Sequence, residues 1–418
     1  MMEYGCIGEK LSHSFSKLIH AELFDYDYTL CEIARERLDE FMKARAFRAI
    51  NVTIPYKESV IPYLDYIDPA AEKIGAVNTV VNRDGRLYGY NTDFLGMKEM
   101  FRFEGISLTG KKVLVLGSGG TSKTAFCVAE DGGCRNVLRV SRSGRDGCIT
   151  YEEAVSLHAD AEVIINTTPS GMFPNIGESA ISLESFGNLC GVADAVYNPL
   201  RSQLVCDAKK RGIPAAGGLY MLVAQAAFAA EKFTGLRVEN EKIIATYKKL
   251  FRQKENIVLT GMPGCGKSTL GRAAAERLGM DFLDTDEEIV KRAGKTIPEI
   301  FAAEGERGFR TLESEVIADA AAKQHTVIAT GGGAVLCERN IDLMRENGRI
   351  YFIDRPLEFL EIGKGRPLSQ DKKALKKRYD ERYSLYCQRC DRRIVPSQDK
   401  EENVGMIVKD FNYEDFGN

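Results

Sequence analysis

A glycine-rich turn directly after an apolar run is the feature that most constrains this 418-residue chain. Residues 257–260 read Ile-Val-Leu-Thr, as in a buried strand, and residues 261–269 read GMPGCGKST, which fits the pattern G-x-x-x-x-G-K-[ST]. Glycines in such a turn let backbone N–H groups surround a phosphate at the positive end of the following helix. The pattern therefore predicts the strand, loop and helix of a P-loop fold.

The residue types in this loop indicate how a nucleoside triphosphate would be bound. Lys267 is expected to reach the β- and γ-phosphates, and the hydroxyl of Ser268 is expected to hold Mg²⁺. Apolar residues recur on one face of the helix that follows, and Gly279 is expected to end it. The loop residues assigned to the nucleotide are Gly264, Cys265, Gly266, Lys267, Ser268 and Thr269.

Composition argues against several broad classes of protein. A hydrophobic content of 44% and a charged content of 28% are typical of globular proteins, and the length predicts two or three domains. The net charge of −3 argues against a general nucleic-acid-binding surface, and no apolar stretch is long enough to predict a membrane span. Eleven cysteines without a recognisable targeting segment favour free thiols and a cytoplasmic location.

A second nucleotide-binding pattern precedes the P-loop. Residues 113–116 read Val-Leu-Val-Leu and run into GSGGTS at 117–122, the strand–turn–helix order of a doubly wound fold. Ser122 stands where G-x-G-x-x-G has its third glycine, so this fingerprint is weak when taken alone.

The end of the next expected strand, residues 137–140, bears on cofactor choice. An NAD site places an acid there to bind the ribose hydroxyls, and this chain has none. Arg142 and its flanking serines suit a 2′-phosphate instead, so NADP(H) is expected. The alternative is that Arg142 and Arg145 are solvated loop charges. The residues assigned to this cofactor are Gly117, Gly119, Gly120, Thr121, Ser141, Arg142 and Ser143.

Seven short motifs follow one another through the first 250 residues. They are SHSFS (12–16), NVTIPYK (51–57), GAVNT (75–79), YNTD (90–93), GSGG (117–120), NTTPSGM (166–172) and GGLYMLVAQAA (217–227). Their combination and order resemble the shikimate dehydrogenase family. The resemblance implies reduction of 3-dehydroshikimate with NADPH, and it implies that Lys57 and Asp93 are the catalytic pair that moves the proton.

The same resemblance implies a substrate site. Shikimate is a small cyclohexene carboxylate with three hydroxyls, which calls for hydroxyl donors and amide partners. Any one Ser, Thr or Asn is more often a cap or turn residue, but their joint occurrence favours the site. The residues it assigns are Ser14, Ser16 and Thr53 at the carboxylate, Asn78 and Gln225 at the ring hydroxyls, and Tyr197.

Two departures from that family pattern stand out. The chain reaches Tyr151 soon after Arg145, so the helix expected after the second strand is short or missing, and Gly217 stands where many relatives have Asp. The first departure motivates an alternative in which the N-terminal half is a catalytically silent module. A further alternative is that the dehydrogenase also accepts quinate.

The second half carries its own ordered motifs. LDTD (283–286), FRTLE (309–313), TGGGAV (330–335), GRPL (365–368) and ERYSLY (381–386) resemble shikimate kinase over about residues 256–400. Gluconate-type and nucleoside kinases share the P-loop but do not predict this set. The resemblance implies ATP and Mg²⁺ as ligands. It assigns Asp284 to Mg²⁺, Asp286 to the attacking hydroxyl as catalytic residue, Arg310 and Arg382 to the carboxylate, Gly332 to the ring, and Arg366 to a lid over the phosphates.

The lid segment departs from the kinase pattern. Shikimate kinases commonly carry another Arg several residues before the lid Arg, and residues 358–366 contain none besides Arg366. Lys364, between two glycines, is the neighbouring cation, and we expect it to share the contact with the nucleotide phosphates.

The expected fold class is α/β throughout, with a Rossmann-type NADP domain inside a two-domain dehydrogenase and then a P-loop kinase domain with a parallel sheet and helices on both faces. The predicted domains are residues 1–105 plus 219–251 for dehydrogenase substrate, 106–218 for NADP, and 252–418 for the kinase. Together they predict a fused enzyme that makes shikimate and then consumes it. Its expected partners are the small molecules 3-dehydroshikimate and shikimate, with no nucleic acid and no membrane, and it is expected to be a monomer or homodimer.

Overall fold

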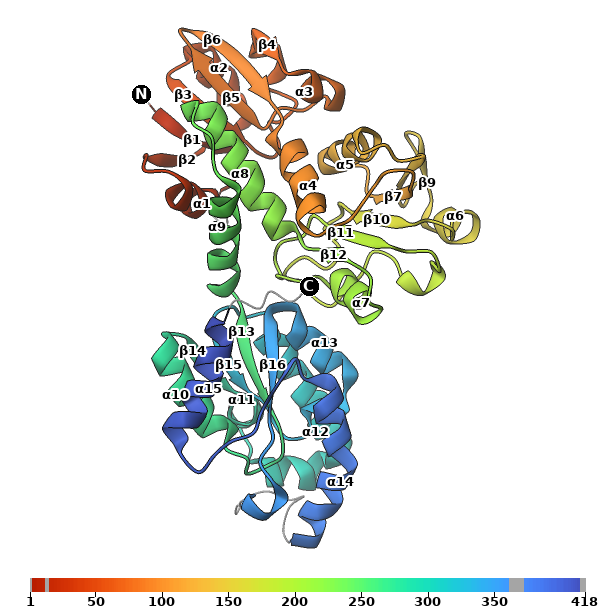
Figure 1. Ribbon diagram of the computed structural model, residues 1–418, viewed down its shortest axis with the longest axis vertical. Coiled ribbons are helices and arrows are strands. Elements are labelled where there is room, and N and C mark those ends of the chain that lie inside the picture. The colour runs from red at the N-terminus through yellow and green to blue at the C-terminus, as the bar shows by residue number, and fades with distance from the viewer. Residues whose placement is uncertain (1, 12–14, 361–371, 414–418) are drawn as a thin grey trace. The chain divides into compact units, whose positions relative to one another are not determined.

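The computed structural model describes residues 2–11, 15–360 and 372–413 and has the expected α/β architecture (Figure 1). Its contacts divide the chain into two compact units. Unit 1 comprises residues 1–172, 178–198 and 207–251, and unit 2 comprises residues 173–177, 199–206 and 252–418. The three sheets of the described residues are each contained in one unit.

The first sheet of unit 1 is mixed, with strand order β2-β1-β3-β5-β6-β4. β1 pairs in parallel with β2 and β3, whereas β5 pairs antiparallel with β3 and β6. The strands are β1 Met2–Gly8, β2 Tyr28–Glu32, β3 Phe47–Val52, β4 Tyr66–Ile67, β5 Thr79–Arg83 and β6 Arg86–Tyr90. The helices of this part are α1 Ser16–Leu23, α2 Leu38–Ala44, α3 Pro69–Ile74 and α4 Thr92–Phe103.

The second sheet of unit 1 is parallel throughout, with order β12-β11-β10-β7-β8-β9. β7 and β10 are neighbours although two strands separate them in sequence, so the strand order reverses between them, as in a doubly wound nucleotide fold. The strands are β7 Lys112–Leu116, β8 Asn136–Val140, β9 Cys148–Ile149, β10 Val163–Asn166, β11 Gly191–Asp194 and β12 Ala215–Ala216, and the helices of this stretch of chain are α5 Gly120–Asp131, α6 Tyr151–Leu157 and α7 Gln203–Lys210.

The short helix predicted after the second strand of this fold is α6, which has seven residues. Thr150 and Glu153 close its first turn as a capping box, in which each side chain accepts from the other residue's backbone N–H. A reciprocal cap of this kind stabilises a helix that is too short to be stable in isolation.

Two C-terminal helices of unit 1, α8 Gly218–Thr234 and α9 Asn240–Arg252, pack back on the earlier elements. α8 is apolar on nearly all sides because it is buried, and its tightest neighbour is α4. α9 is amphipathic and turns Ile243 and Leu250 into the same core. The ring of Tyr247 meets that of Phe103, with centroids 5.7 Å apart.

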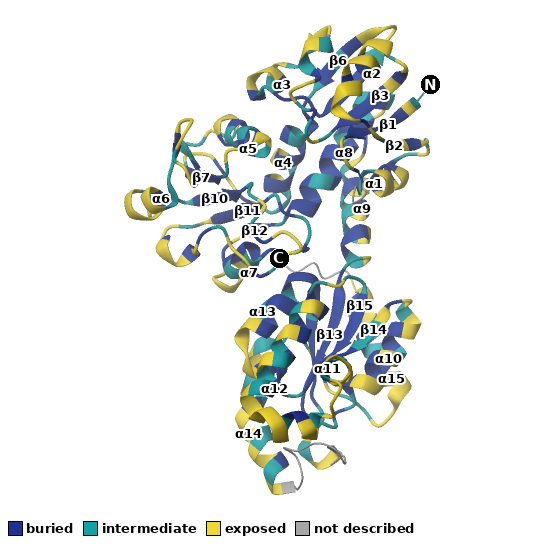
Figure 2. Cartoon of the chain, turned by 180° about the vertical axis from the view of Figure 1, so that it is seen from behind, coloured by how far each residue is buried: buried dark blue, intermediate teal, exposed yellow. Residues whose placement is uncertain are grey.

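Unit 2 is built on a five-stranded parallel sheet with order β14-β15-β13-β16-β17. Figure 2 shows these strands buried, with exposed surface on the outer sides of the helices. The strands are β13 Asn256–Thr260, β14 Asp281–Asp284, β15 Thr326–Ala329, β16 Gly348–Ile353 and β17 Arg392–Ile394. The helices are α10 Lys267–Leu278, α11 Thr285–Ala293, α12 Ile297–Ala321, α13 Glu338–Asn347, α14 Lys372–Arg389 and α15 Lys400–Asn412. α10 ends as predicted at Gly279, whose φ of 65° is left-handed.

Glu255, which precedes the first strand of unit 2, is the centre of a buried ion-pair cluster. Its side chain is 3% exposed and lies 3.0 Å from the guanidinium of Arg201 and 3.1 Å from that of Arg349. Arg201 also donates to the carbonyl of Gly348 at 3.0 Å. The polar segment 252–255, which joins α9 to β13, therefore ends in a paired and buried carboxylate.

No helix of the described residues is long and apolar enough to cross a membrane.

The close approach of α4 and α8 gives a stability prediction. A Cβ on Gly96 would lie 2.7 Å from the carbonyl oxygen of Met221 and 2.8 Å from the Cβ of Gln225. We expect Gly96→Ala to force the helices apart and to lower the free energy of unfolding by about 1–3 kcal/mol. The urea-unfolding midpoint, followed by circular dichroism, measures this.

The matched control is Gly405→Ala on α15, where an added Cβ would find no atom within 4 Å. That change is expected to stabilise by about 0.5–1 kcal/mol, because alanine favours a helix interior over glycine. A Gly96→Ala variant as stable as wild type would contradict the tight α4–α8 contact.

Candidate active sites

The two residues assigned to catalysis in the N-terminal half lie in contact. Lys57 Nζ is 2.6 Å from Asp93 Oδ2, and the two side chains are 27% and 17% exposed. Lys57 lies in the segment that follows β3, and its carbonyl accepts from Val77 N at 2.8 Å. This hydrogen bond joins that segment to the residues just before β5. A half-buried ammonium held by a carboxylate can donate a proton to a carbonyl oxygen placed beside it.

Asp93 lies in the first turn of α4, where the helix begins under a side-chain cap. Asn91 is the N-cap residue and accepts from Phe94 N at 3.1 Å, and its amide donates to the carbonyl of Ala76 at 2.9 Å. The positive end of the α4 dipole favours a carboxylate at this point. The YNTD motif thus serves both to start the helix and to orient Asp93.

The two amides assigned to ring hydroxyls are linked through one threonine. Thr92 donates from its backbone N to Asn78 Oδ1 at 2.7 Å, and its hydroxyl donates to Gln225 Oε1 at 3.5 Å. Gln225 also donates to the carbonyl of Leu222 at 3.0 Å on α8. Since the carbonyl oxygen of Asn78 is held in this way, its NH₂ group is the part that can donate to a ligand hydroxyl.

The residues assigned to the substrate carboxylate are only partly described. Ser14 lies outside the described residues. Ser16 begins α1, and Thr53 follows β3 with its backbone N donating to the carbonyl of Ile7 at 3.0 Å. Tyr197 packs edge-on against Phe15, with ring centroids 5.6 Å apart, and burial raises the pKa of its phenol.

The glycine turn after β7 is closed by the residue that departs from the fingerprint. Ser122 is fully buried, and its hydroxyl donates to the carbonyl of Gly117 at 2.7 Å. At Gly119 and Gly120, which begin α5, an added Cβ would meet no atom within 4 Å, so the backbone there faces open space. Backbone N–H groups in this position suit a pyrophosphate. Thr121 is half-buried in the same turn.

In the loop after β8, two serines form hydrogen bonds with the backbone of the loop itself, and an arginine is exposed. Ser141 Oγ accepts from Gly144 N at 3.2 Å, and Ser143 Oγ accepts from Arg145 N at 3.4 Å. Arg142 is exposed, and its charge acts on Tyr151, whose pKa is raised by burial and lowered by this guanidinium. Arg142 is thus an exposed cation in the loop after β8, and a guanidinium there suits a 2′-phosphate.

The P-loop of unit 2 wraps its own lysine. Lys267 is 8% exposed, and its ammonium donates to the carbonyls of Gly261 at 2.8 Å and Met262 at 3.0 Å. The thiol sulfur of Cys265 lies 3.7 Å from the same nitrogen. Lys267 and Ser268 open α10, so the loop's backbone stands at a helix N-terminus. Gly264, Gly266, Ser268 and Thr269 line the adjoining cavity of about 250 Å³.

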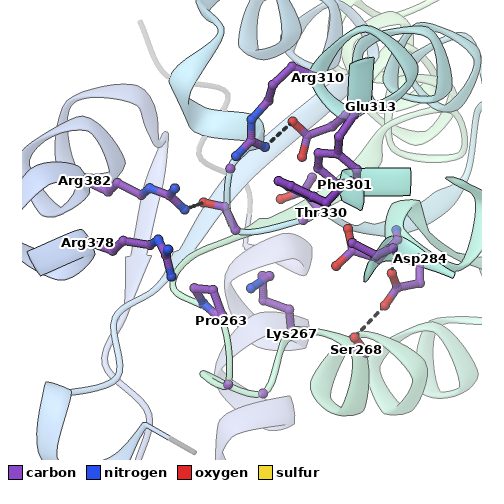
Figure 3. Close-up of a pocket in the computed structure, with 18 of the residues that line it drawn as sticks. Pro263, Lys267, Ser268, Asp284, Phe301, Arg310, Glu313, Thr330, Arg378 and Arg382 are labelled. Atoms are coloured by element: carbon purple, nitrogen blue, oxygen red, sulfur yellow. Dashed lines mark hydrogen bonds and ion pairs between the residues drawn. The ribbon is translucent and has the colours of Figure 1, made fainter. Parts of the chain in front are cut away.

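The residues assigned to Mg²⁺ and to the attacking hydroxyl form one connected set (Figure 3). Ser268 Oγ donates to Asp284 Oδ2 at 2.5 Å, and Asp284 Oδ1 accepts from Asp286 N at 2.9 Å. Asp284 is the N-cap of α11, so Asp286 lies in the first turn with its carboxylate on the cavity. A hydroxyl beside a carboxylate suits Mg²⁺, which is bound through few protein ligands together with substrate phosphates.

Arg310 is held at the cavity wall by a carboxylate that the sequence assignment omitted. Its guanidinium lies 2.6 Å from Glu313 and 3.2 Å from Glu306. The Glu313 side chain is 1% exposed, and burial raises its pKa while Arg310 opposes that shift. A Cβ on Gly331 would lie 2.6 Å from Asp286 and 2.9 Å from Glu313, so only a glycine lets both acids approach here.

Arg382 faces the same cavity from α14. Its guanidinium donates to the carbonyl of Gly332 at 3.0 Å, and Tyr386 OH donates to that oxygen at 2.5 Å. Both side chains are almost completely buried. The glycine run between β15 and α13 is therefore fixed by two donors from one helix, and Arg310 and Arg382 approach the cavity from different elements.

The structure adds cavity residues to those assigned from the sequence. Glu313 stands three residues after Arg310, and Arg378 stands four residues before Arg382, both spacings that place two side chains on one helix face. Those spacings are the signal that could have found them. Lys364 and Arg366 lie outside the described residues. The further lining residues are Pro263, Ile297, Phe301, Phe309, Glu313, Thr330, Gly331, Gly333 and Arg378.

Comparisons with known proteins give a family match in each half of the chain. Residues 6–80 match the family described as Shikimate dehydrogenase substrate binding domain, and residues 263–411 match the family described as Shikimate kinase. A shikimate dehydrogenase (NADP(+)) of Clostridium beijerinckii is 37% identical over 255 residues, which are 57% of this chain and 94% of the relative.

Solved structures give the same result for the N-terminal half. Shikimate dehydrogenase 1 from Peptoclostridium difficile is 36% identical with a TM-score of 0.54, over 60% of this chain and 98% of that one. The shikimate 5-dehydrogenase of Thermus thermophilus, in complex with NADP(H) and shikimate, is 30% identical with a TM-score of 0.54, over 60% of this chain and 99% of that one. The chain therefore belongs to the shikimate dehydrogenase family over about 60% of its length and carries a shikimate kinase domain at residues 263–411.

Proposed function

We propose that this chain is a bifunctional enzyme that reduces 3-dehydroshikimate to shikimate with NADPH and phosphorylates shikimate at its 3-hydroxyl with MgATP. The observation that supports it best is that the described residues of one chain bring together side chains suited to each of the two reactions. Lys57 contacts Asp93 in unit 1, and Ser268, Asp284 and Asp286 are connected in unit 2. The product of the first reaction is the substrate of the second.

In the dehydrogenase reaction NADPH would supply the hydride to the ketone carbon. Lys57 would donate a hydrogen bond to the ketone oxygen and hand it a proton as the alkoxide forms, and Asp93 would keep the ammonium in place. Asn78 and Gln225 would bind the ring hydroxyls, since Thr92 already fixes both amides. Ser14, Ser16, Thr53 and Tyr197 are proposed for the remainder of the substrate.

In the kinase reaction Asp286 would accept the proton of the 3-hydroxyl as that oxygen attacks the γ-phosphorus. Lys267 would leave its loop carbonyls for the phosphate oxygens, and Ser268 and Asp284 would hold the metal ion. Arg310 and Arg382 would bind the shikimate carboxylate, a planar anion that suits a guanidinium. Apolar side chains at 297, 301 and 309 would cover the ring.

One assay tests both activities in the intact chain. 3-Dehydroshikimate is supplied with NADPH, ATP and Mg²⁺, and NADPH oxidation and ADP release are followed together. We expect NADPH oxidation first and ADP release that depends on it. ADP release from added shikimate without NADPH oxidation would favour the silent dehydrogenase module, and neither signal would contradict the proposed function.

The first activity prediction concerns the dehydrogenase pair. We expect Lys57→Ala and Asp93→Asn each to lower the dehydrogenase kcat by roughly 10²-fold or more, because proton transfer loses its donor or its orientation. Kinase turnover of the same variants is expected to be unchanged. The matched controls are Lys43→Ala and Asp39→Asn, an exposed pair 2.9 Å apart in the same unit, and near-normal kcat in the Lys57 and Asp93 variants would reject the assignment.

The second prediction concerns the 2′-phosphate. We expect Arg142→Ala to raise KM for NADPH much more than KM for NADH, because a charge-assisted hydrogen bond to the 2′-phosphate is lost. The free energy of binding lost for NADPH is expected to be about 1.5–3 kcal/mol. Arg135→Ala is the control, since Arg135 precedes β8 at the opposite end of the strand and pairs with Glu162. A wild-type enzyme that uses NADH as well as NADPH would overturn the role given to Arg142.

The third prediction separates the two ligands of the kinase. Arg382→Ala is expected to weaken shikimate binding by about 1.5–3 kcal/mol and to leave ATP binding intact, because the guanidinium meets the carboxylate and not the nucleotide. Lys267→Ala is expected to do the reverse. Calorimetric titration with each ligand measures both effects, and Arg272→Ala on α10, an exposed partner of Glu287, is the control. Loss of ATP affinity in Arg382→Ala would contradict this division.

A further inference from the structure

Arg378 is a third arginine on the kinase cavity. It lies on α14 four residues before Arg382, one helical turn away on the same face, and it lines the cavity with the P-loop residues Pro263 and Gly264. Its side chain is half-buried although the helix surface around it is exposed. In Figure 3 its guanidinium points into the cavity between Arg382 and Pro263.

The charges around Arg378 favour a bound anion. Burial lowers its pKa, and Arg382 and Arg310 lower it further, whereas Glu306 and Glu381 oppose the shift. Three guanidiniums at one cavity repel one another, and that repulsion is relieved when a negative group lies among them. Arg310 lies on α12, and Arg378 and Arg382 lie on α14, so the helices hold these three charges at the cavity before a ligand binds.

The other two arginines already account for one anion. Arg310 is oriented by Glu313 and Glu306, and Arg382 by the carbonyl of Gly332. A carboxylate offers about four lone-pair sites on its two oxygens, so two bidentate guanidiniums are sufficient to satisfy it. Arg378 stands on the P-loop side of this pair, beside the turn expected to hold the phosphates.

We infer that Arg378 contacts the phosphoryl group as it passes from the nucleotide to the shikimate hydroxyl. In that step the bond from the γ-phosphorus to the bridging oxygen breaks, the bond from the 3-oxygen to phosphorus forms, and the hydroxyl proton goes to Asp286. Arg378 lies between Arg382 and Pro263, so the oxygens of the transferred group would pass it on the way from the P-loop to the ring. A guanidinium fixed on a helix supplies this stabilisation without rearranging. The inference rests on the proposed kinase function.

The experiment compares ligands that differ by one phosphate. The full-length chain and its Arg378→Gln, Arg378→Lys and Lys377→Gln variants are titrated calorimetrically with shikimate and with shikimate 3-phosphate, both in the presence of MgADP. Lys377 is the matched control, because it is the neighbouring cation on α14, its side chain is 79% exposed, and it pairs with Glu381 at 3.9 Å. Steady-state kinase assays give kcat and both KM values for each variant.

We expect Arg378→Gln to weaken shikimate 3-phosphate binding at least about tenfold and to lower kcat by a similar factor, because a charged hydrogen bond is lost. Shikimate affinity is expected to stay within about twofold, Arg378→Lys to be intermediate, and Lys377→Gln to match wild type.

Equal loss of affinity for both ligands would assign Arg378 to the carboxylate and overturn the inference, as would no loss for either. Those outcomes leave the proposed function standing when the wild-type chain phosphorylates shikimate. A wild-type chain that binds neither ligand would overturn the proposed function and this inference with it.

Discussion

Both glycine turns depend on one constraint, the absence of a side chain where a central parallel strand ends. After β7, Gly117 has φ of 117°, and a Cβ there would lie 2.6 Å from the Thr167 hydroxyl. After β13, Gly261 has φ of 142°, and a Cβ there would lie 2.8 Å from the carbonyl of Ile353. Each turn can therefore fold tightly against the neighbouring strand and aim the next helix's N-terminus outward. The positions of α5 and α10, and hence of both nucleotide sites proposed here, follow from these two residues.

The charged side chains of both sites are held by partners that a ligand would replace or share. Lys57 is paired with Asp93, Lys267 is bound by its own loop carbonyls, and Arg310 is paired with Glu313. Such pairing offsets the cost of half-burying a charge and fixes its direction before substrate arrives. In unit 2, Lys267 and three arginines line the cavity together with Asp284, Asp286 and Glu313. The basic side chains are the groups of this cavity that suit an anionic substrate.

Local patterns in the sequence were sufficient for the elements that local chemistry decides. The P-loop strand and helix, the stop at Gly279 and the short α6 all agree with the sequence prediction. The residues that escaped it depend on contacts across the chain. Arg378 reaches the cavity only because α14 packs beside the glycine run at 331–333, and the burial of Glu255 requires arginines 54 and 94 residues away. Helix spacing marks such residues as neighbours of a site residue, but it does not say which way the helix faces.

If the two proposed activities are consecutive, their fusion has a physical consequence that does not require a passage between the two sites. A small molecule released from one site diffuses away much faster than a typical enzyme with a turnover of about 10 s⁻¹ completes its next cycle. Tethering raises the effective concentration of a partner that stays attached to the linker, and a free metabolite is not attached. On the proposed function, the advantage of one chain is equal numbers of both sites, so that the shikimate that unit 1 would form always has a kinase site made in the same amount. This advantage depends on each unit folding and turning over, and not on how the two are oriented.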